Sequence, residues 1–535
     1  MDKYPLIRKC LVIEIILLFV GASGILGMST SVNTGKMPQT TQRKIQAIQK
    51  DVIGQSCLGS NALISNNTGN DFHPRMTTNS LGHTIVVYEQ EIDSYNKNVA
   101  VVYSADDGEI WTEQLLFDSD YFTSGSGILE YPDIVYNAPN DLLYLTMIDP
   151  DAEMYNNEMC FIPGDIANCV PEEVKDKWYG VSACGDDYVG NAATTTDNFF
   201  LSMTIRNGTL DRYLEIFYVT YPDYETPYGI GGVYPDYGSV HITNPASNIE
   251  MDTGNRIYVV AESGVEEGPK ITVKSATADE ELLSSGVQQN GMDKYPDVEQ
   301  WPGEYVAIGT DPDVSAFGNK VFIVYTQNGT VKCSYSTADK GYEPQFNWNV
   351  STIDSGASAP AIYAQGNAVY CAYVKGGNLY MKTSEDGGVT WGAAEQKNDV
   401  DGTVVAEKGA IDICRSGIAF TDNRNGNYDI YFSSITVAPA PVIVIDSISG
   451  GVGVRAVIRN IGVVPAEYCR WSIKTEGLVF VGKETSGIAT LQPGASTTIK
   501  TGFMLGFGPI AITVIADTAK KTADAQLFLF FVKGL

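Results

Sequence analysis

The feature that most constrains the fold is a unit of short strands that recurs along the chain. The clearest copy runs from Asp311 to Gly341, the next begins at Ala359 and the last at Gly409. Each copy has a starting segment that often holds Pro, a short apolar strand, a turn and a tyrosine-bearing strand. Such self-similarity indicates a repeat architecture in which neighbouring units bury each other's faces.

Weaker copies precede these three and begin near Pro74, Pro132, Ala193 and Ser247. Runs rich in Val, Ile and Tyr between Gly, Asn and Asp turns predict strands, and no long segment shows a helical period. Small sheets stacked radially bury both faces and leave short edges. The sequence therefore predicts an all-β fold in which residues 51–438 form a β-propeller of six or seven blades, with seven favoured. We expect the run from Asp51 to Cys57 to complete the last blade.

A Ser-x-Asp-x-Gly-x-x-Trp pattern occurs twice, each time between two predicted strands. Ser and Asp two residues apart can bond the backbone of a tight turn, Gly permits a positive φ, and Trp can fold into the seam between sheets. The pattern resembles the Asp-box of sialidase-type (BNR-repeat) β-propellers, which implies a structural hairpin on the outer rim. The matching residues are Ser104, Asp106, Gly108 and Trp111, and Ser384, Asp386, Gly388 and Trp391.

The same resemblance implies where a sialidase would carry its chemistry. Sialidases are implied to use three arginines against the substrate carboxylate, a Tyr nucleophile activated by a Glu, and an Asp acid/base. Arg75 is the nearest match to the first arginine, but Pro74 precedes it where the family has Ile-Pro after the arginine. No nucleophilic Tyr can be assigned among the 31 tyrosines.

Position in the repeat offers another route to a site, because the strand starts of a propeller surround its central channel. Arg75, Tyr131, Asp133 and Asp313 occupy such positions, and we interpret them as candidate ligand contacts. Aromatic rings beside acids suit sugars, which present apolar ring faces and hydroxyl groups. The alternative is that a Pro-Asp pair only begins a strand after a turn.

One acidic run predicts a metal site. Asp149, Asp151 and Glu153 could supply oxygen ligands to calcium, although the run is shorter than a full ligand set. No other cofactor is predicted. The three histidines, His73, His83 and His241, form no metal or catalytic pattern and are interpreted as structural.

The N-terminus indicates export. Lys3, Arg8 and Lys9 precede an apolar run from Cys10 to Gly27, which predicts a secretory signal over residues 1–28 and a linker over 29–50. The alternative is an uncleaved membrane anchor. In an oxidising compartment we expect disulfides, with Cys160–Cys169 as the best local pair and Cys333–Cys371 as another option.

The composition changes at the APAP run of residues 438–441, which predicts a domain boundary. Two alternating hairpins and regular turn signals indicate a small β-sandwich over residues 439–535. Short motifs within it, RNIG, LQPGAS and ADT, resemble the adhesion-type (CARDB-like) immunoglobulin-like domains of microbial surface proteins. A lone Cys469 is predicted to be a buried small hydrophobe.

The net charge excludes one class of binding partner. A formal charge of −29 repels phosphate backbones and anionic lipid surfaces, so nucleic acid is not expected as a partner. We expect a secreted or cell-surface protein that binds a glycan or a surface protein and touches a membrane only through an uncleaved N-terminus. The alternatives are an exo-acting glycoside hydrolase of the sialidase type, a lyase on the same scaffold, and a structural envelope protein.

Overall fold

The structure is a computed structural model, and the described residues begin at Ile45 and end at Gly534. They are 45–47, 52–55, 61–65, 67–119, 127–137, 141–150, 155–183, 190–193, 198–207, 211–220, 228–233, 241–251, 256–265, 268–277, 304–317, 320–337, 346–436, 441, 443–462, 464–517 and 519–534. Side chains are described for most of 61–147, 160–174 and 305–534, and for Tyr258, Val260, Ile271 and Val273.

The described elements are strands, apart from two 3₁₀ helices, η1 (Ile166–Asn168) and η2 (Pro171–Glu173). The all-β prediction is therefore confirmed. None of the helices in the described ranges is both long and apolar enough to cross a membrane.

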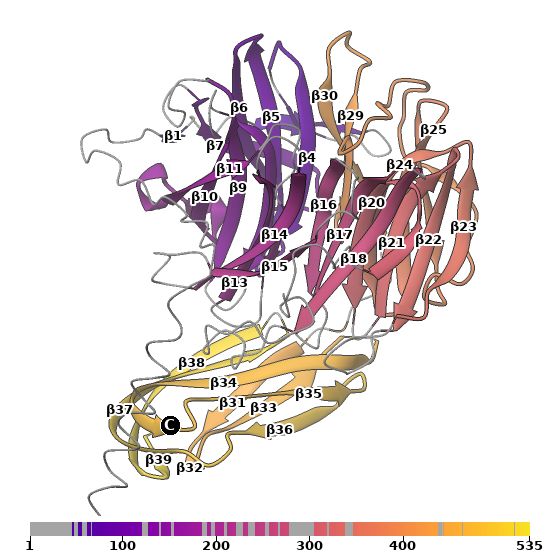
Figure 1. Cartoon of the computed structure of the whole chain (residues 1–535). Coiled ribbons are helices and arrows are strands. Elements are labelled where there is room, and N and C mark those ends of the chain that lie inside the picture. Colours follow the sequence, from indigo (N-terminus) through magenta and orange to yellow (C-terminus); the bar gives the residue numbers. More distant parts are fainter. Residues whose placement is uncertain are drawn as a thin grey trace, which may run out of the picture.

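Seven antiparallel sheets follow one another in the described residues up to Ser434 (Figure 1). Sheet 1 contains β1 (Ile45–Ala47), β2 (Val52–Gln55), β4 (Asp71–Thr78), β5 (Thr84–Asp93), β6 (Asn96–Ser104) and β7 (Ile110–Phe117). Sheet 2 contains β8 (Glu130–Asn137), β9 (Leu142–Pro150), β10 (Tyr155–Pro163) and β11 (Lys175–Ala183). Sheet 3 contains β12 (Gly190–Ala193), β13 (Asn198–Asn207), β14 (Asp211–Thr220) and β15 (Tyr228–Val233). Sheet 4 contains β16 (His241–Met251), β17 (Arg256–Val265), β18 (Gly268–Thr277) and β19 (Glu304–Ile308).

The last three of these sheets are the most regular. Sheet 5 contains β20 (Thr310–Phe317), β21 (Lys320–Gln327), β22 (Thr330–Thr337) and β23 (Asn349–Ser355). Sheet 6 contains β24 (Ser358–Gln365), β25 (Ala368–Lys375), β26 (Asn378–Ser384) and β27 (Glu395–Gln396). Sheet 7 contains β28 (Ile411–Cys414), β29 (Gly417–Asp422), β30 (Asp429–Ser434) and β3 (Ala62–Leu63).

Two-residue hairpins join β21 to β22 in sheet 5 and β25 to β26 in sheet 6. Asn328 and Gly329 both have positive φ, 50° and 66°, and lie between the paired residues Gln327 and Thr330. These angles define a type I′ turn, whose twist matches that of the strands it connects. The Asn-Gly turn thus fixes the register of β21 on β22.

The sheets form a closed ring. The first strand of each sheet contacts the first strand of the next, in the order β4, β8, β12, β16, β20, β24 and β28, and β28 contacts β4 again. Hydrophobic clusters fill the seams between neighbouring sheets; one cluster, for example, joins Trp111 and Tyr88 of sheet 1 to Phe432 and Ile430 of sheet 7. Because a small sheet cannot bury both faces alone, this packing accounts for the ring.

The strand that completes sheet 7 differs from the predicted one. β2, within the predicted Asp51–Cys57 run, pairs with β7 of sheet 1 instead. β3 pairs with β30, and its extension is fixed by a 2.9 Å bond from the N–H of Ile64 to the carbonyl of Ile430. The N–H of Ile430 donates in return to the Ser65 hydroxyl at 3.0 Å. The Ile64 side chain is buried in the seam between sheets 7 and 1. This burial stabilises β3 as the fourth strand of sheet 7.

A bulge recurs in the first strands of sheets 1, 2, 5 and 6. In each, a residue with positive φ precedes a proline, and the strand register shifts across this pair. The prolines therefore lie inside the strands, whereas the sequence predicted them at the strand starts. Proline has no N–H to donate, and the extra residue at a bulge does not need one, because it is not paired in the ladder. The residues with positive φ are His73 (48°), Tyr131 (49°), Asp311 (52°) and Ala359 (49°).

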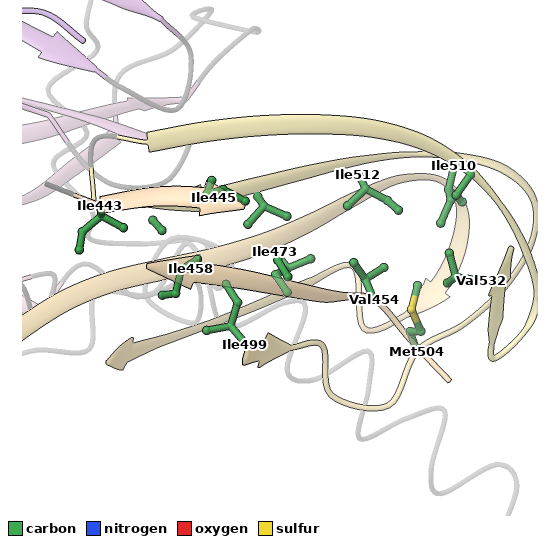
Figure 2. Packing of buried hydrophobic residues seen from close by; sticks show 14 of the residues in the cluster. Ile443, Ile445, Val454, Ile458, Ile473, Ile499, Met504, Ile510, Ile512 and Val532 are labelled. Atoms are coloured by element: carbon green, nitrogen blue, oxygen red, sulfur yellow. The ribbon is translucent and has the colours of Figure 1, made fainter. Parts of the chain in front are cut away.

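The remaining residues form two sheets that pack face to face. Branched aliphatic side chains fill the space between them, and in Figure 2 they form a row from Ile443 at one end to Met504, Ile510 and Val532 at the other. The predicted boundary at residue 438 lies outside the described residues. One sheet contains β31 (Ile443–Ser449), β33 (Arg455–Asn460) and β36 (Ser496–Lys500). The other contains β32 (Gly451–Val452), β39 (Phe531–Lys533), β38 (Ala519–Leu529), β37 (Leu505–Ala516), β34 (Ala466–Val481) and β35 (Glu484–Leu491).

The predicted disulfides are wrong in this structure. Cys160, Cys169, Cys333 and Cys371 are free and buried. Cys333 and Cys371 share the seam between sheets 5 and 6 but remain thiols, and burial raises the pKa of both. They act as small apolar side chains. Cys469 is likewise buried and free, as expected.

Candidate functional site

The first strands of sheets 1, 5, 6 and 7, with the residues just before β28, line a small cavity. Arg75, Asp311, Asp313, Lys408 and Asp412 provide its charged lining. Its volume is about 20 Å³, which is room for about one water molecule. The cavity in this structure is smaller than a sugar ring.

Two lining carboxylates tie neighbouring sheets together. Asp313 accepts hydrogen bonds from the N–H of Val314 at 2.9 Å and, across the seam, from the N–H of Ile362 at 2.7 Å. Asp412 repeats this arrangement with Ile413 at 2.9 Å and Met76 at 2.7 Å. These carboxylates are therefore structural as well as cavity-lining.

Asp133 has the same local bond but is not part of the described cavity. Its carboxylate accepts from the N–H of Ile134 at 3.0 Å, as Asp313 does from Val314. Both Asp133 and Asp313 are buried. The four predicted ligand contacts therefore do not meet at one place. Arg75 and Asp313 line the cavity, whereas Asp133 and Tyr131 lie in β8 of sheet 2.

A second group of charged side chains lies where β4, β5, β6 and β8 meet. Glu89 is 1% exposed, and its Oε1 lies 2.6 Å from Nδ1 of His73 and 2.8 Å from the N–H of Tyr131. Lys97 Nζ lies 3.4 Å from Glu89 Oε2 and 2.7 Å from Glu130 Oε1. We call these five residues the mouth cluster.

The mouth cluster keeps Glu89 ionised. Burial alone would raise the pKa of Glu89, but His73, Lys97 and the Tyr131 N–H outweigh it and lower the pKa to about 2. A carboxylate only accepts hydrogen bonds, so Nδ1 of His73 carries the proton in this contact. The contact with Glu89 thus fixes the orientation of the His73 ring.

Half-buried rings continue from the mouth cluster into sheet 7. The ring of Tyr131 lies 4.9 Å from that of His73, and Phe72 lies 6.1 Å from His73. Tyr428 meets Phe72 edge to face at 5.5 Å, and Lys97 lies over Phe72 at 5.7 Å. We call Tyr428, Phe72, His73 and Tyr131 the aromatic row; all four are only partly buried.

The first Ser-x-Asp-x-Gly-x-x-Trp hairpin bonds its own turn. The Ser104 hydroxyl donates to Asp106 at 2.7 Å and accepts from the N–H of Gly108 at 2.9 Å, while Asp106 accepts from the N–H of Ile110 at 2.8 Å. Trp111 is fully buried and lies 4.9 Å from the ring of Phe432 in sheet 7. This hairpin therefore fastens sheet 1 to sheet 7.

The second hairpin fastens sheet 6 to sheet 5 in the same way. Ser384 bonds Asp386 at 2.8 Å and the N–H of Gly388 at 2.9 Å. The indole N–H of Trp391 donates to the hydroxyl of Ser351, in β23 of sheet 5, at 2.9 Å. In both hairpins the hydrogen bonds lie within the turn or join two sheets. They stabilise the packing of the sheets and do not form a ligand site.

The three-arginine arrangement of a sialidase is not assembled in the described side chains. Arg75 lines the cavity, whereas Arg424 pairs with Asp422 at 2.8 Å and with Asp399 at 2.6 Å in a turn, and Arg415 is exposed. The side chains of Arg206, Arg212 and Arg256 lie outside the described part.

The predicted calcium loop falls largely outside the described residues. Asp151 and Glu153 are not described, and only the backbone of Asp149 is, so the loop stays a prediction. Among the described side chains, no group of three or more His, Cys, Asp and Glu could hold a metal ion.

Comparisons with known proteins find distant likenesses of fold. Neither a protein-family model nor a curated protein matches the sequence. A prolyl endopeptidase structure matches with a TM-score of 0.36 and 11% identity over 74% of this chain; the chain spans about half, 55%, of that one. A polysaccharide lyase matches with a TM-score of 0.41 and 12% identity over 70% of this chain and 91% of its own. The exo-β-1,3-galactanase of Phanerochaete chrysosporium matches with a TM-score of 0.26 and 10% identity over 64% and 94%.

Proposed function

We propose that this chain is a secreted or cell-surface glycan-binding protein. It is built on a seven-bladed, sialidase-like β-propeller and ends in an immunoglobulin-like domain. The closed ring of seven sheets supports the blade number, and the two fastening hairpins support the sialidase-like form. The two-sheet sandwich supports the immunoglobulin-like domain. The observation that carries the function is the aromatic row with Lys97 and Glu130 beside it.

The aromatic row suits a sugar because a pyranose ring has apolar faces and a polar rim. The ring of Tyr131 would stack on such a face. Lys97 and Glu130, each about a quarter exposed, would bond hydroxyl groups at the rim. A buried network holds these groups in place, so little conformational freedom is lost on binding.

A glycan array probed with the full chain tests this proposal, followed by titration of a retained glycan against variants. Tyr131→Ala removes one stacking ring, and we expect binding to weaken about tenfold, or ~1.4 kcal/mol. Tyr136→Ala is the matched control, since Tyr136 lies in the same strand but bonds Asp141 at 2.7 Å. Retention of no glycan would favour a structural envelope role, and equal losses in both variants would place the site elsewhere.

The His73–Glu89 pair favours one second candidate, a lyase. In β-elimination at a uronic acid, a base removes the proton beside the carboxylate, a C=C bond forms as the bond to the glycosidic oxygen breaks, and water protonates that oxygen. His73 would act as the base through Nε2, and Lys97 would hold the carboxylate. Incubation with uronate-containing polysaccharides would then yield unsaturated ends that absorb ultraviolet light, and His73→Gln would abolish them. Binding without such products would assign the site to recognition alone.

The location of the protein rests on its N-terminal sequence. The basic residues Lys3, Arg8 and Lys9 and the apolar run after them support export and cleavage near residue 28. N-terminal sequencing of the protein made by its native cell tests this: a mature chain that begins near residue 29 is expected. A chain that retains Lys3 would instead support a membrane anchor.

A further inference from the structure

One end of the six-stranded sheet of the sandwich carries apolar side chains on its outer face. Val452 is paired with Phe531, and Phe531 with Phe528. Phe528 is paired in turn with Phe507, and their rings lie 5.0 Å apart. Directly paired residues in a sheet point to the same face, so these four side chains form a ladder across four strands. Val532, next to Phe531, points into the core instead (Figure 2).

Neighbouring residues extend the ladder. We call the group the apolar tip and define it by its phenylalanines, which are between 40% and 69% exposed: Phe480, Phe503, Phe507, Phe528, Phe530 and Phe531. An aromatic side chain buries about 150–250 Å² when it is covered, so at these exposed fractions the rings present roughly 600 Å². Val452 and Leu478, 61% and 64% exposed, add to this area.

This area is that of an interface. The largest apolar patch on a typical monomer is about 300–600 Å², whereas each partner in a stable protein–protein interface buries about 800 Å². The apolar tip with its two aliphatic neighbours approaches the second value. We therefore infer that another surface covers it.

The rows of the sheet next to the ladder carry both signs of charge. Lys533 is paired with Gln526, one row from the ladder. The following row contains Glu476 and Asp524, which are both paired with Ala511. Lys533, Glu476 and Asp524 line one hollow of about 470 Å³. The surface beside the apolar tip is thus neither basic nor acidic as a whole.

The strand order relates two of these charges by symmetry. β38 and β37 lie in the middle of the apolar tip, β39 flanks β38, and β34 flanks β37. Lys533 lies on β39 and Glu476 on β34. A two-fold axis that runs along the strands between β37 and β38 would therefore place β39 of one copy against β34 of the other. Lys533 of each copy would then reach Glu476 of the other.

We propose that the apolar tip is the interface of a two-fold symmetric homodimer of this chain. Phe528 of each copy packs on Phe507 of the other, and Phe531 of each copy packs on Leu478 of the other. Such an interface uses the same patch twice, so a patch that carries both a base and an acid complements itself. Burial of the rings provides the affinity, and the charge pairs fix the register.

Charge favours a second copy over a bilayer as the occupant. At a bilayer, Glu476 and Asp524 would face lipid phosphates, which repel carboxylates. A second copy instead presents Lys533 to Glu476. Residues 441–535 contain nine Lys and Arg against six Asp and Glu, so two sandwiches that meet do not repel each other strongly. The charge of the acidic first part of the chain is screened beyond about 10 Å at ordinary salt.

Sedimentation velocity of the full chain over a range of concentrations tests this dimer. We expect the wild type to sediment as a dimer, and Phe528→Ser to raise the concentration of half dissociation at least tenfold. Ile488→Ser is the matched control and should leave the dimer unchanged. Ile488 is 51% exposed but is paired with Arg470, eight residues before Leu478 on β34. Every variant keeps the N-terminal apolar run, so that run cannot account for a difference.

An exchange of charges tests the symmetry itself. Lys533→Glu alone and Glu476→Lys alone each place like charges opposite each other at both ends of the interface, so each should weaken the dimer about tenfold. In an equimolar mixture of the two variants, opposite charges meet at both ends again. The mixture should therefore sediment as a dimer at a concentration where each variant alone is monomeric.

Three results would overturn the proposal. The first is a wild type that stays monomeric at every concentration. The second is a dimer that Phe528→Ser leaves intact, because its interface would then lie elsewhere. The third is a mixture of the two charge variants that associates no better than either variant alone. Both charge changes are on exposed side chains, so circular dichroism should show folds and melts like those of the wild type.

Discussion

Asp313 shows how one buried carboxylate can join two sheets. It accepts one backbone N–H from its own strand and one from β24 across the seam. The residue at the equivalent point of sheet 7, Asp412, does the same for Met76. An acid at this point is thus explained by packing, without a ligand.

Replacing Asp313 by Ala should destabilise the protein by about 3 kcal/mol, because two buried N–H groups lose a charged acceptor. Chemical denaturation measures this change. The exposed Glu385 provides the control, and its replacement by Ala should change stability by no more than about 0.5 kcal/mol. Equal effects of the two substitutions would contradict the structural role of Asp313.

Asp71 predicts a dependence of stability on pH. Burial raises its pKa to about 8, against the partial effect of hydrogen bonds from Ser65 and Asn67, and Asp429 and Glu113 raise it further. The folded state therefore holds a proton that the unfolded state loses near pH 4. Stability from this group is full below about pH 4 and declines as pH rises towards 8.

Asp71→Asn removes this titration while it keeps the shape of the side chain. We expect the difference between the melting temperatures of the variant and the wild type to rise by several degrees in favour of the variant from pH 4 to pH 8. Scanning calorimetry at a series of pH values measures the difference. A constant difference across this range would mean that Asp71 is ionised in the folded protein.

At the scale of elements, the two fastening hairpins differ in one contact. Gly108 and Gly388 both have positive φ, 91° and 83°. A methyl group on Gly108 would overlap the ring of Phe432, whereas one on Gly388 would lie 3.4 Å from the nearest atom, in Tyr335. The same substitution therefore has a different effect in each hairpin.

Gly388→Ala should cost roughly 1 kcal/mol from backbone strain alone. Gly108→Ala should cost at least twice as much, because it adds steric overlap in a packed seam. Urea denaturation of the two variants side by side checks this order. Equal losses would show that the seam between sheets 1 and 7 yields without cost.

The bulges mark a limit of prediction from sequence at this scale. The repeats, their tyrosine strands and the Asn328–Gly329 turn could be read directly, because each depends on residues close in the chain. Pro74 and Pro132 were expected to begin strands. Whether these prolines lie inside a bulge depends on the register of the neighbouring strand, β5 or β9. A single sequence does not contain that register.

At the scale of the whole molecule, β3 closes the ring, and we expect its removal to prevent cooperative folding. A chain that begins at Asn61 loses β1 and β2 but keeps β3, and we expect it to fold with a modest loss of stability. A chain that begins at Gly69 leaves β30 as an open edge and removes Ile64 from the seam. We expect this chain to melt without cooperativity or to aggregate.

Circular dichroism melts and size-exclusion chromatography of the two truncated chains distinguish these outcomes. Similar cooperative melts would show that sheets 1 and 7 hold together without β3.

The candidate site was accessible to sequence analysis only in part. Tyr131 follows from its place in the repeat, whereas Arg75 and Asp313, predicted on the same ground, line the small cavity instead. His73 was expected to be structural, and Glu89, Lys97 and Glu130 gave no signal, since their meeting depends on the contact between sheets 1 and 2. The one available signal was the charge of Glu89 and Lys97 in otherwise apolar strands.

The closing contact between β3 and β30 also has a consequence for biosynthesis. Ser65 and Ile430 are 365 residues apart, so β3 must wait for nearly the last part of the ring to be synthesised. At 5–20 residues per second, this delay is roughly 20 to 70 seconds. During that time the face of sheet 1 that will meet sheet 7 stays uncovered, so the ring can close only late in synthesis.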